Sequence, residues 1–453
     1  MVHLAEPRLS GLARNPAAPT STLVRLAAHA AGRAGLRRRK GPLPDPVADA
    51  MLTHGGRDAA TLLRPNRISP AVRRRIAEHP DPAIRDAHAD FVRTMVARGV
   101  PLGLDALVDA YGLPPEELAA HGDPKVRAVL AQDWHDRPPA VHEMLLTDPD
   151  PDVRAAAARA QHLGIPSALT ERCLADPAVR THIVHRLPLT QEQFERLLAT
   201  GDPSVLASVA AHPALTPAMV ARLEDSEDPS VRVAVAYSRH VTPDTRDRLL
   251  ALVEAESAAG GIDAEVALHW SSYRPAWLRD APLAERLSYL DCPHPAFRKV
   301  LATSPGLPEE AWRRLDEDPV VSVRFAAARR HDVPAEVLLR LVREHGDPAT
   351  GLPGLVAHPR FPRHELRGLA EEPDPRVRFL ALEDPLLPAA VMRRLGGAEE
   401  AFLRAGVARH PNIEVPLLER LLSDPDPDVV EEAAANPALP EAWMDRVPAE
   451  ADL

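Results

Sequence analysis

Eight residues in this sequence of 453 have side chains of the kinds that contact a binding partner, and they fall into two groups. The first group is a basic run made of Arg37, Arg38, Arg39 and Lys40. The second group combines aromatic rings with a cation and is made of Trp270, Tyr273, Arg274 and Trp277. Trp, Tyr and Arg carry much of the binding energy at protein interfaces, and clustered cations attract phosphates or carboxylates. These eight are therefore the candidate partner-binding residues.

Both groups also have a structural interpretation, which the sequence leaves open. The basic run lies in residues 32–46, a segment bounded by glycine and proline, as a solvated loop would be. The aromatic group lies in residues 250–290, which contain four of the chain's 16 aromatic residues. Because tryptophan is highly buried on average, these rings could instead fill a gap in a core otherwise lined by alanine.

A third set of charged residues recurs along the chain in the phrase Asp-Pro-x-Val-Arg and its variants. The anchor arginines of this phrase are Arg85, Arg127, Arg154, Arg180, Arg232, Arg298, Arg324 and Arg378. They could form a ladder that binds an acidic polymer, or they could pair with Asp side chains and helix carbonyl groups of adjacent units. Since they recur in nearly every unit, we expect the structural role.

No arrangement of residues in the sequence predicts catalysis or a metal site. The chain contains no phosphate-binding loop, dinucleotide fingerprint, zinc-protease motif or nucleophile elbow. Cys173 and Cys292 stand 119 residues apart, and neither has a second Cys or a His at metal-ligand spacing. Several of the 20 histidines occupy a recurring slot before proline, where Asn, Asp and Ser also occur. We therefore expect no enzymatic activity, no cofactor and no metal.

The elements that must position these residues follow from an internal repeat. Asp150, Asp176, Asp202 and Asp228 each open a copy of the phrase, and each copy begins 26 residues after the last. Looser copies extend toward both ends of the chain, to a total of about fourteen units. After each phrase come a polar residue with proline, a lone aliphatic residue, a second proline and a leucine-rich stretch.

Each unit is expected to form two short helices. Asp is a good N-cap, and proline is tolerated in the first helical turn. Val231, Ala234 and Val235 show the spacing of a one-sided helix, and the polar residue before proline ends that helix. The second proline opens a helix of about two turns, too short to be stable alone. Units must therefore bury their apolar sides on one another, which predicts an all-α solenoid of about 14 two-helix repeats of ~26 residues.

The repeating unit, Asp-Pro-x-Val-Arg followed by His/Asn-Pro-x-Leu-Pro and Leu-x-Arg-Leu, resembles the variant leucine-rich repeat (LRV) family and, more distantly, HEAT repeats. The resemblance covers nearly the whole chain. It implies a right-handed superhelix in which a longer helix alternates with a short or 3-10 helix. The family has no shared catalytic activity, so the resemblance implies a fold and little about function.

Departures from the repeat divide the chain into four predicted segments. Residues 1–122 hold degenerate repeats with the basic loop 32–46, and residues 123–250 hold regular repeats. Residues 251–290 form an irregular, aromatic-rich repeat, and residues 291–453 hold regular repeats and a C-terminal cap.

Composition and charge narrow the class of protein further. Hydrophobic residues make up 45% of the chain, and no apolar run is long enough for a membrane span. The N-terminus does not resemble a secretory signal, and two isolated thiols fit a reducing cytoplasm. The strong preference for Arg over Lys suggests a GC-rich, bacterial genome. Residues 1–100 hold 17 Lys and Arg against 8 Asp and Glu, whereas residues 101–453 hold 37 against 57.

These observations favour a cytoplasmic, non-catalytic scaffold that binds a protein or peptide on a concave solenoid face. The excess of acidic residues after residue 100 favours a basic partner. The alternative is a nucleic-acid-binding, HEAT-like protein, similar to a DNA glycosylase, that uses the basic N-terminal region. The acidic remainder of the chain argues against that alternative, and nucleic acid is therefore the less favoured partner.

Overall fold

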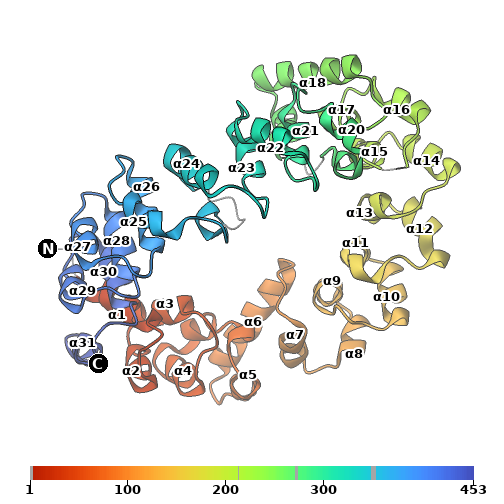
Figure 1. Cartoon of the computed structure of the whole chain (residues 1–453). Helices are drawn as coiled ribbons and strands as arrows, with labels where there is room; N and C mark the ends of the chain where they lie inside the picture. Colours follow the sequence, from red (N-terminus) through yellow and green to blue (C-terminus); the bar gives the residue numbers. More distant parts are fainter. Residues whose placement is uncertain (1–3, 213, 271–273, 348–353) are drawn as a thin grey trace. The chain divides into compact units, whose positions relative to one another are not determined.

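The fold is a computed structural model that describes residues 4–212, 214–270, 274–347 and 354–453 (Figure 1). These residues form 31 α-helices and several short 3-10 turns, with no β-strand among them. The predicted all-α solenoid is thus confirmed. The chain divides into two compact units, of which unit 1 is Met1–Leu118 with Pro334–Leu453 and unit 2 is Ala119–Val333. Among the described helices, none has the length and apolar character needed to cross a bilayer.

The first helices of the chain are α1 (Ala5–Arg14), α2 (Thr20–Leu26), α3 (Ala30–Arg38), α4 (Asp45–Ala60), α5 (Pro70–Ala77), α6 (Pro82–Ala97), α7 (Leu104–Tyr111) and α8 (Pro115–Ala119). The last are α24 (Ala335–His345), α25 (Leu366–Leu369), α26 (Pro375–Leu380), α27 (Ala389–Leu395), α28 (Ala401–Arg409), α29 (Val415–Leu421), α30 (Pro427–Ala434) and α31 (Glu441–Ala449).

Unit 2 contains α9 (Pro124–Asp133), α10 (Pro139–Leu146), α11 (Pro151–Arg159), α12 (Thr170–Ala175), α13 (Arg180–Ile183), α14 (Gln191–Leu198), α15 (Pro203–Ala210), α16 (Pro217–Leu223), α17 (Pro229–Ala236), α18 (Pro243–Ala258), α19 (Ile262–Glu265), α20 (Leu283–Leu287), α21 (Pro295–Leu301), α22 (Glu309–Asp316) and α23 (Val321–Ala327). Its irregular part adds a π-helical turn, η5 (Val266–Trp270), and a 3-10 turn, η6 (Ala276–Asp280).

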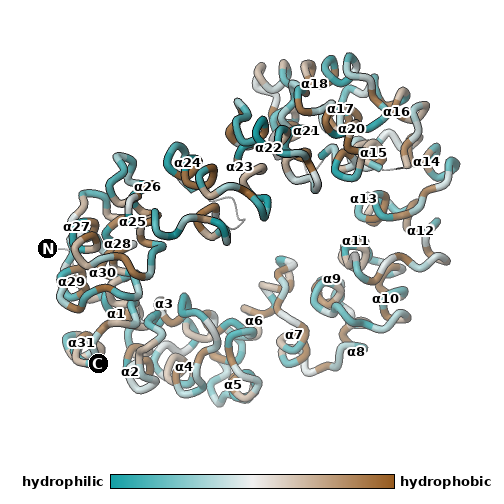
Figure 2. The backbone as a smooth tube through the Cα atoms, in the orientation of Figure 1, coloured by the Kyte–Doolittle hydropathy of each residue, from teal (hydrophilic) through white to brown (hydrophobic). Residues whose placement is uncertain are grey.

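The helices begin where the repeated Asp-Pro phrase predicts. The side chain of Asp202 accepts a hydrogen bond from the backbone N–H of Ser204, and Pro203 occupies the first turn of α15. The valines of the phrase, such as Val205 and Val231, are fully buried. Each phrase helix packs on the phrase helix of the next unit, as α9 does on α11 and α15 on α17. Hydrophobic residues, brown in Figure 2, recur along the helices between hydrophilic ones.

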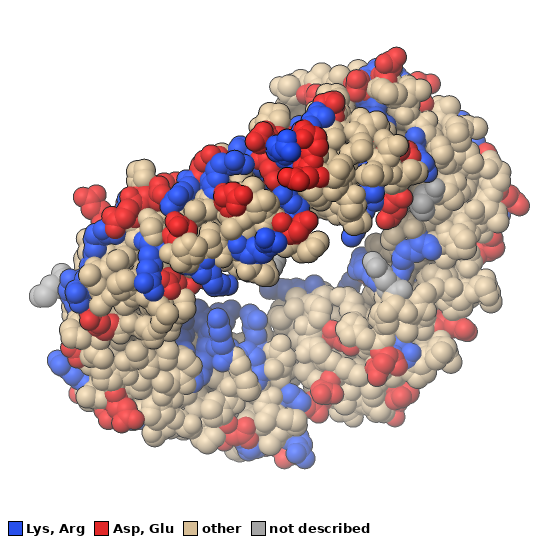
Figure 3. All heavy atoms as spheres, viewed as in Figure 1, with Lys and Arg blue, Asp and Glu red and all other residues tan. Residues whose placement is uncertain are grey.

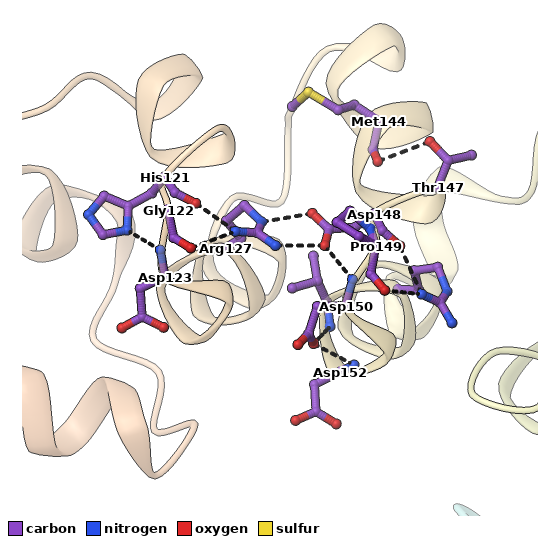
Figure 4. A network of polar contacts seen from close by, with 12 residues as sticks. His121, Gly122, Asp123, Arg127, Met144, Thr147, Asp148, Pro149, Asp150 and Asp152 are labelled. Atoms are coloured by element: carbon purple, nitrogen blue, oxygen red, sulfur yellow. Dashed lines mark hydrogen bonds and ion pairs between the residues drawn. The ribbon is translucent and has the colours of Figure 1, made fainter.

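The anchor arginines hold neighbouring units together. Nη1 of Arg127 donates to the carbonyl oxygens of His121 and Gly122, six and five residues earlier. Its Nε and Nη2 donate to both carboxylate oxygens of Asp148 in the next unit, at 2.7 and 2.8 Å (Figure 4). Arg154 continues the series by donating to the carbonyl oxygen of Asp148. The structural role expected for the anchor arginines is therefore confirmed at Arg127 and Arg154.

The same double arrangement recurs at other anchors. The pairs with a carboxylate of the following unit are Arg154–Asp176, Arg298–Asp318, Arg378–Glu400 and Arg404–Asp424. Elsewhere on the surface, acidic and basic side chains are interspersed (Figure 3).

The polar residue before proline forms a second series of contacts between units. Asn436 donates from its amide to the carbonyl oxygens of Ala408 and His410, at 2.7 and 2.9 Å, and its own Oδ1 accepts from the N–H of Ala438. His410 occupies the preceding slot, and its Nε2 lies 3.0 Å from the carbonyl oxygen of Asp384. The slot residue thus ends one helix and ties it to the unit before.

The N-terminal unit stacks on the C-terminal unit in this manner. Asn15 precedes a proline, and its amide donates to the carbonyl oxygens of Ala434 and Asn436, at 3.1 and 2.6 Å. Helix α1 packs against α30 on one side and against α3 on the other. Arg14 adds ion pairs to Glu431 and Glu432. The two ends of the chain therefore behave as consecutive repeats within unit 1.

Two glycines allow α1 to approach its neighbours closely. A β-carbon added at Gly11 would lie 2.2 Å from the carbonyl oxygen of Glu431. A β-carbon added at Gly35 of α3 would lie 2.2 Å from the carbonyl oxygen of Ser10. Glycine is required at both positions because any side chain would push the helices apart.

The segment predicted as a basic loop, residues 32–46, is helical over much of its length. Helix α3 runs from Ala30 to Arg38, so that prediction is wrong for its first half. Gly32 and Gly35 lie in this segment, and both are buried where α3 meets neighbouring backbone. Close helix packing, and not a turn, explains them.

The two units are defined by contacts, whereas the four predicted segments are defined by the regularity of the repeat and stay a prediction. The first division lies at residues 118/119, near the predicted boundary at 122/123. The second lies at 333/334, and the predicted boundaries around the irregular repeat have no counterpart in this division. The irregular repeat itself is visible: α18 has 16 residues, and only short helical turns follow it before α21.

Candidate functional site

Two pockets in unit 2 lie on either side of the segment 274–280, which belongs to the irregular repeat. The Trp277 pocket has a volume of about 440 Å³ and lies where α15 and α17 end. The Trp312 pocket has a volume of about 450 Å³ and lies where α21 and α23 end. Both pockets are lined by side chains of the segment between them, so we describe them together as the tryptophan groove.

The wall of the Trp277 pocket is an arginine held against an indole. The Arg239 guanidinium lies over the Trp277 ring at 5.8 Å and pairs with Glu285 at 2.7 Å. The indole N–H of Trp277 donates to the carbonyl oxygen of Tyr237 at 2.8 Å, which fixes the orientation of the ring. Arg274 contributes a further charge to the lining.

The wall of the Trp312 pocket has the same construction. The Arg330 guanidinium lies over the Trp312 ring at 4.6 Å, and it donates to both carboxylate oxygens of Asp316 at 2.6 Å. Arg330 and Asp316 expose only 8% of each side chain, so the pair is a rigid, neutral wall. Arg279 and Arg329 line the same pocket.

Behind the groove, three aromatic rings, those of Tyr237, Tyr289 and Phe297, form a core that supports Trp277. Trp277 contacts Tyr289 edge to face at 5.7 Å, and Tyr289 stacks on Phe297 at 5.2 Å. Tyr237 meets Phe297 edge to face from the other side. Arg246 closes the cluster, with its guanidinium 4.4 Å from the Phe297 ring centroid. The irregular repeat is thus packed as a rigid support for one half of the groove.

Five arginines and two acidic residues, Asp280 and Asp332, line the two pockets, and two of the arginines are already paired with Glu285 and Asp316. Unit 2 holds 24 Lys and Arg against 31 Asp and Glu. The lining of the Trp312 pocket nevertheless has three arginines and one acidic residue, Asp332. The lining of the groove therefore carries a small excess of positive charge.

The structure places the predicted aromatic group only in part. Trp277 is half-buried, so it both fills the core and lines a pocket, and Arg274 is exposed beside it. The side chain of Trp270 and the whole of Tyr273 lie outside the described residues. Trp277 therefore fits both interpretations of this group, because it packs in the core and also lines a pocket.

The predicted basic run lies in unit 1, away from the groove residues in sequence. Arg38 pairs with Glu431, and Arg39 donates to the carbonyl oxygens of Ala13 and Asn15. Burial, followed by repulsion from Arg67, lowers the pKa of Arg39. Arg37 and Lys40 are exposed. Two of the four cations are therefore used inside the fold.

Sequence reasoning missed Trp312, Arg329 and Arg330. They lie in regular repeats, where the pattern marks nothing unusual. The one available signal was composition, because Trp312 is one of only five tryptophans in the chain. Among the described residues, no group of three or more His, Cys, Asp and Glu could hold a metal ion.

Residues 401–426 match the family described as Leucine rich repeat variant. The matched stretch begins with α28, includes α29 and ends at Asp426, the N-cap of α30, so it is one complete repeat. The resemblance drawn from the repeating phrase is confirmed there. No curated protein matches the sequence.

Proposed function

We propose that the chain is a non-catalytic repeat scaffold that binds a protein or peptide partner in the tryptophan groove. The observation that supports this proposal is the pair of arginine-on-tryptophan walls, each beside further arginines. Trp and Arg are the residue types that dominate binding energy when they lie in a preformed pocket. Because each wall is already held by an ion pair, a partner would find these side chains ordered in advance.

The charge of the groove favours a partner with acidic side chains at the point of contact. Arg274 and Arg279 are both exposed and lie in the segment between the two pockets. The expectation of a basic partner rests on the acidic net charge after residue 100. Surfaces outside the groove carry that charge, and for them a basic partner stays a prediction. At the groove, charge complementarity favours an acidic partner instead.

The nucleic-acid alternative rested on the basic N-terminal region. Within that region, Arg38 and Arg39 are already paired with groups of unit 1. Those two cations are therefore less available to a phosphate backbone, and we do not propose this alternative.

The proposal is tested by affinity purification from the native cell with three forms of the full chain. Wild type is compared with Trp312→Ala, which removes one wall of the groove, and with Trp443→Ala. Trp443 is a matched control because Arg446 stacks on it at 4.7 Å in unit 1, outside the groove. We expect a defined set of proteins to be lost with Trp312→Ala and retained with Trp443→Ala. Identical sets from all three forms would refute the proposal.

A further inference from the structure

We infer that the tryptophan groove recognises an extended acidic peptide segment through two bulky apolar side chains, one seated in each pocket. This inference rests on the proposed function and specifies the partner of the same site. It follows from a correspondence between the two pockets that neither sequence motif nor family resemblance shows.

The two pockets are built from equivalent positions of the repeat. Ala210 in the Trp277 pocket corresponds to Ala302 in the Trp312 pocket, and Ala234 corresponds to Ala326. The offset is 92 residues in both cases, and the same offset relates each of the eight positions that the repeats contribute to the Trp277 pocket to a lining position of the Trp312 pocket. These eight pairs are Ala210/Ala302, Ala211/Thr303, His212/Ser304, Ala234/Ala326, Tyr237/Arg329, Ser238/Arg330, Arg239/His331 and His240/Asp332.

The tryptophan of each pocket comes from a different element. Trp277 comes from η6, whereas Trp312 comes from α22. Each ring nevertheless carries a stacked arginine that an acidic residue neutralises, Glu285 in one case and Asp316 in the other. The indole and the alanine side chains of each lining form an apolar wall for a bulky apolar group, and polar or charged side chains line the rest of each pocket. Two such pockets favour a ligand with two apolar anchors.

The charges that lie between the pockets specify the remainder of the ligand. Arg274 lines one pocket and Arg279 lines the other, and both come from the segment that separates them. That segment also carries Asp280, so a chain that runs from pocket to pocket crosses a small excess of positive charge. Acidic residues between the two anchors would complement it, whereas lysines would be repelled.

The inference is tested with fluorescein-labelled peptides of 14 residues in a Glu/Ser background, titrated with the full chain and followed by fluorescence anisotropy. One series carries two Phe residues separated by 2 to 8 positions, and the reference peptides carry one Phe or none. We expect the best two-Phe peptide of the series to bind at least about tenfold tighter than the one-Phe peptide because the second contact is intramolecular. The same peptide in a Lys/Ser background should bind more weakly.

Variants assign the two anchors to the two pockets. Trp312→Ala should reduce the affinity for the two-Phe peptide to that for the one-Phe peptide, and Trp443→Ala should change nothing. Trp277 also packs in the aromatic core, so its removal could disturb the fold. The second variant is therefore Arg279→Glu. It should weaken the binding of the Glu/Ser peptides while circular dichroism shows an intact fold.

Failure of this inference is distinguishable from failure of the proposed function. Equal affinity for one-Phe and two-Phe peptides at every spacing would overturn the two-anchor inference, and tighter binding of the Lys/Ser series would overturn the acidic partner. Neither result would affect the purification experiment. Conversely, identical protein sets from wild type and Trp312→Ala would refute the scaffold function at the groove, whatever the peptides do.

Discussion

The side-chain amide of Asn15 lies 2.6 Å from the carbonyl oxygen of Asn436, although 421 residues separate the two. Asn436 makes the same contact with His410, one unit earlier. Asn15 and Asn436 are both almost fully buried. The interface between the two chain ends therefore uses the chemistry of any neighbouring pair of repeats, and apolar end surfaces of α1 and α30 cover each other.

The first prediction concerns this junction. Gly11→Ala adds a β-carbon 2.2 Å from the carbonyl oxygen of Glu431 and 2.7 Å from the β-carbon of Ala434. Because both obstacles belong to a packed helix, α1 must move away from α30. We expect unit 1 to lose about 1–3 kcal/mol of stability, the usual cost of overpacking. Hydrogen exchange should show faster exchange of the amides of α1 and α30.

The control is Gly122→Ala, which makes the same chemical change where no atom lies within 4 Å of the added carbon. Unchanged protection of the amides of α1 and α30 in Gly11→Ala would contradict the close packing of α1 on α30. Faster exchange in the control would show that the effect is not specific to close packing.

The regular repeats could be predicted from the sequence because their determinants are local. Asp150, Asp228 and Asp426 each cap the helix that follows, as the Asp-Pro phrase indicates. Asp or Asn before proline is likewise a local signal for the end of a helix. A period of 26 residues then fixes which units are neighbours, so the pairing of anchor arginines with the next unit also followed.

The junction and half of the groove could not be predicted, because no local pattern encodes them. Gly35 resembles a loop glycine until the backbone of α1 is placed against it. Trp312 sits in a regular repeat, and its role depends on Arg330 folding over its ring. Trp277 could be singled out because it lies where the repeat is interrupted, and such an interruption can be recognised in the sequence alone.

The second prediction concerns the arginine series. Arg404 and Asp424 expose 13% and 7% of their side chains and form two hydrogen bonds at 2.8 and 2.9 Å. Asp424→Ala leaves the guanidinium with only the carbonyl oxygens of its own unit as partners. Removing one member of a buried pair typically costs 3–5 kcal/mol, so we expect a loss of about 3 kcal/mol in urea unfolding.

The matched control is Glu414→Ala. It removes the partner of Arg393, another ion pair between units, whose side chains are 55% and 43% exposed. An exposed pair is worth at most about 1 kcal/mol, so the control should differ little from wild type. Equal losses in the two variants would mean that the arginine series does not hold the units together.

The last prediction concerns pH and a buried contact between Arg137 and His142. Arg137 is 2% exposed, has no carboxylate partner among its hydrogen bonds and donates to Nδ1 of His142. Burial lowers the pKa of Arg137 to about 10, and the group remains charged at neutral pH. Since an arginine only donates, Nδ1 accepts, and the ring proton on Nε2 faces the carbonyl oxygen of Gly164 at 3.0 Å. His142 is thus held neutral.

Burial, with a smaller contribution from Arg137, lowers the pKa of His142 below its usual value of 6.5. The unfolded chain therefore takes up a proton before the folded chain as the pH falls below about 6.5, and the folded state loses stability from there down to the folded pKa. His142→Gln keeps one acceptor and one donor but cannot titrate. We expect it to remove about 1 kcal/mol of the stability lost between pH 7.5 and 5.5 in urea unfolding. An unchanged slope in His142→Gln would show that the folded protein does not hold the pKa of His142 below that of the unfolded chain.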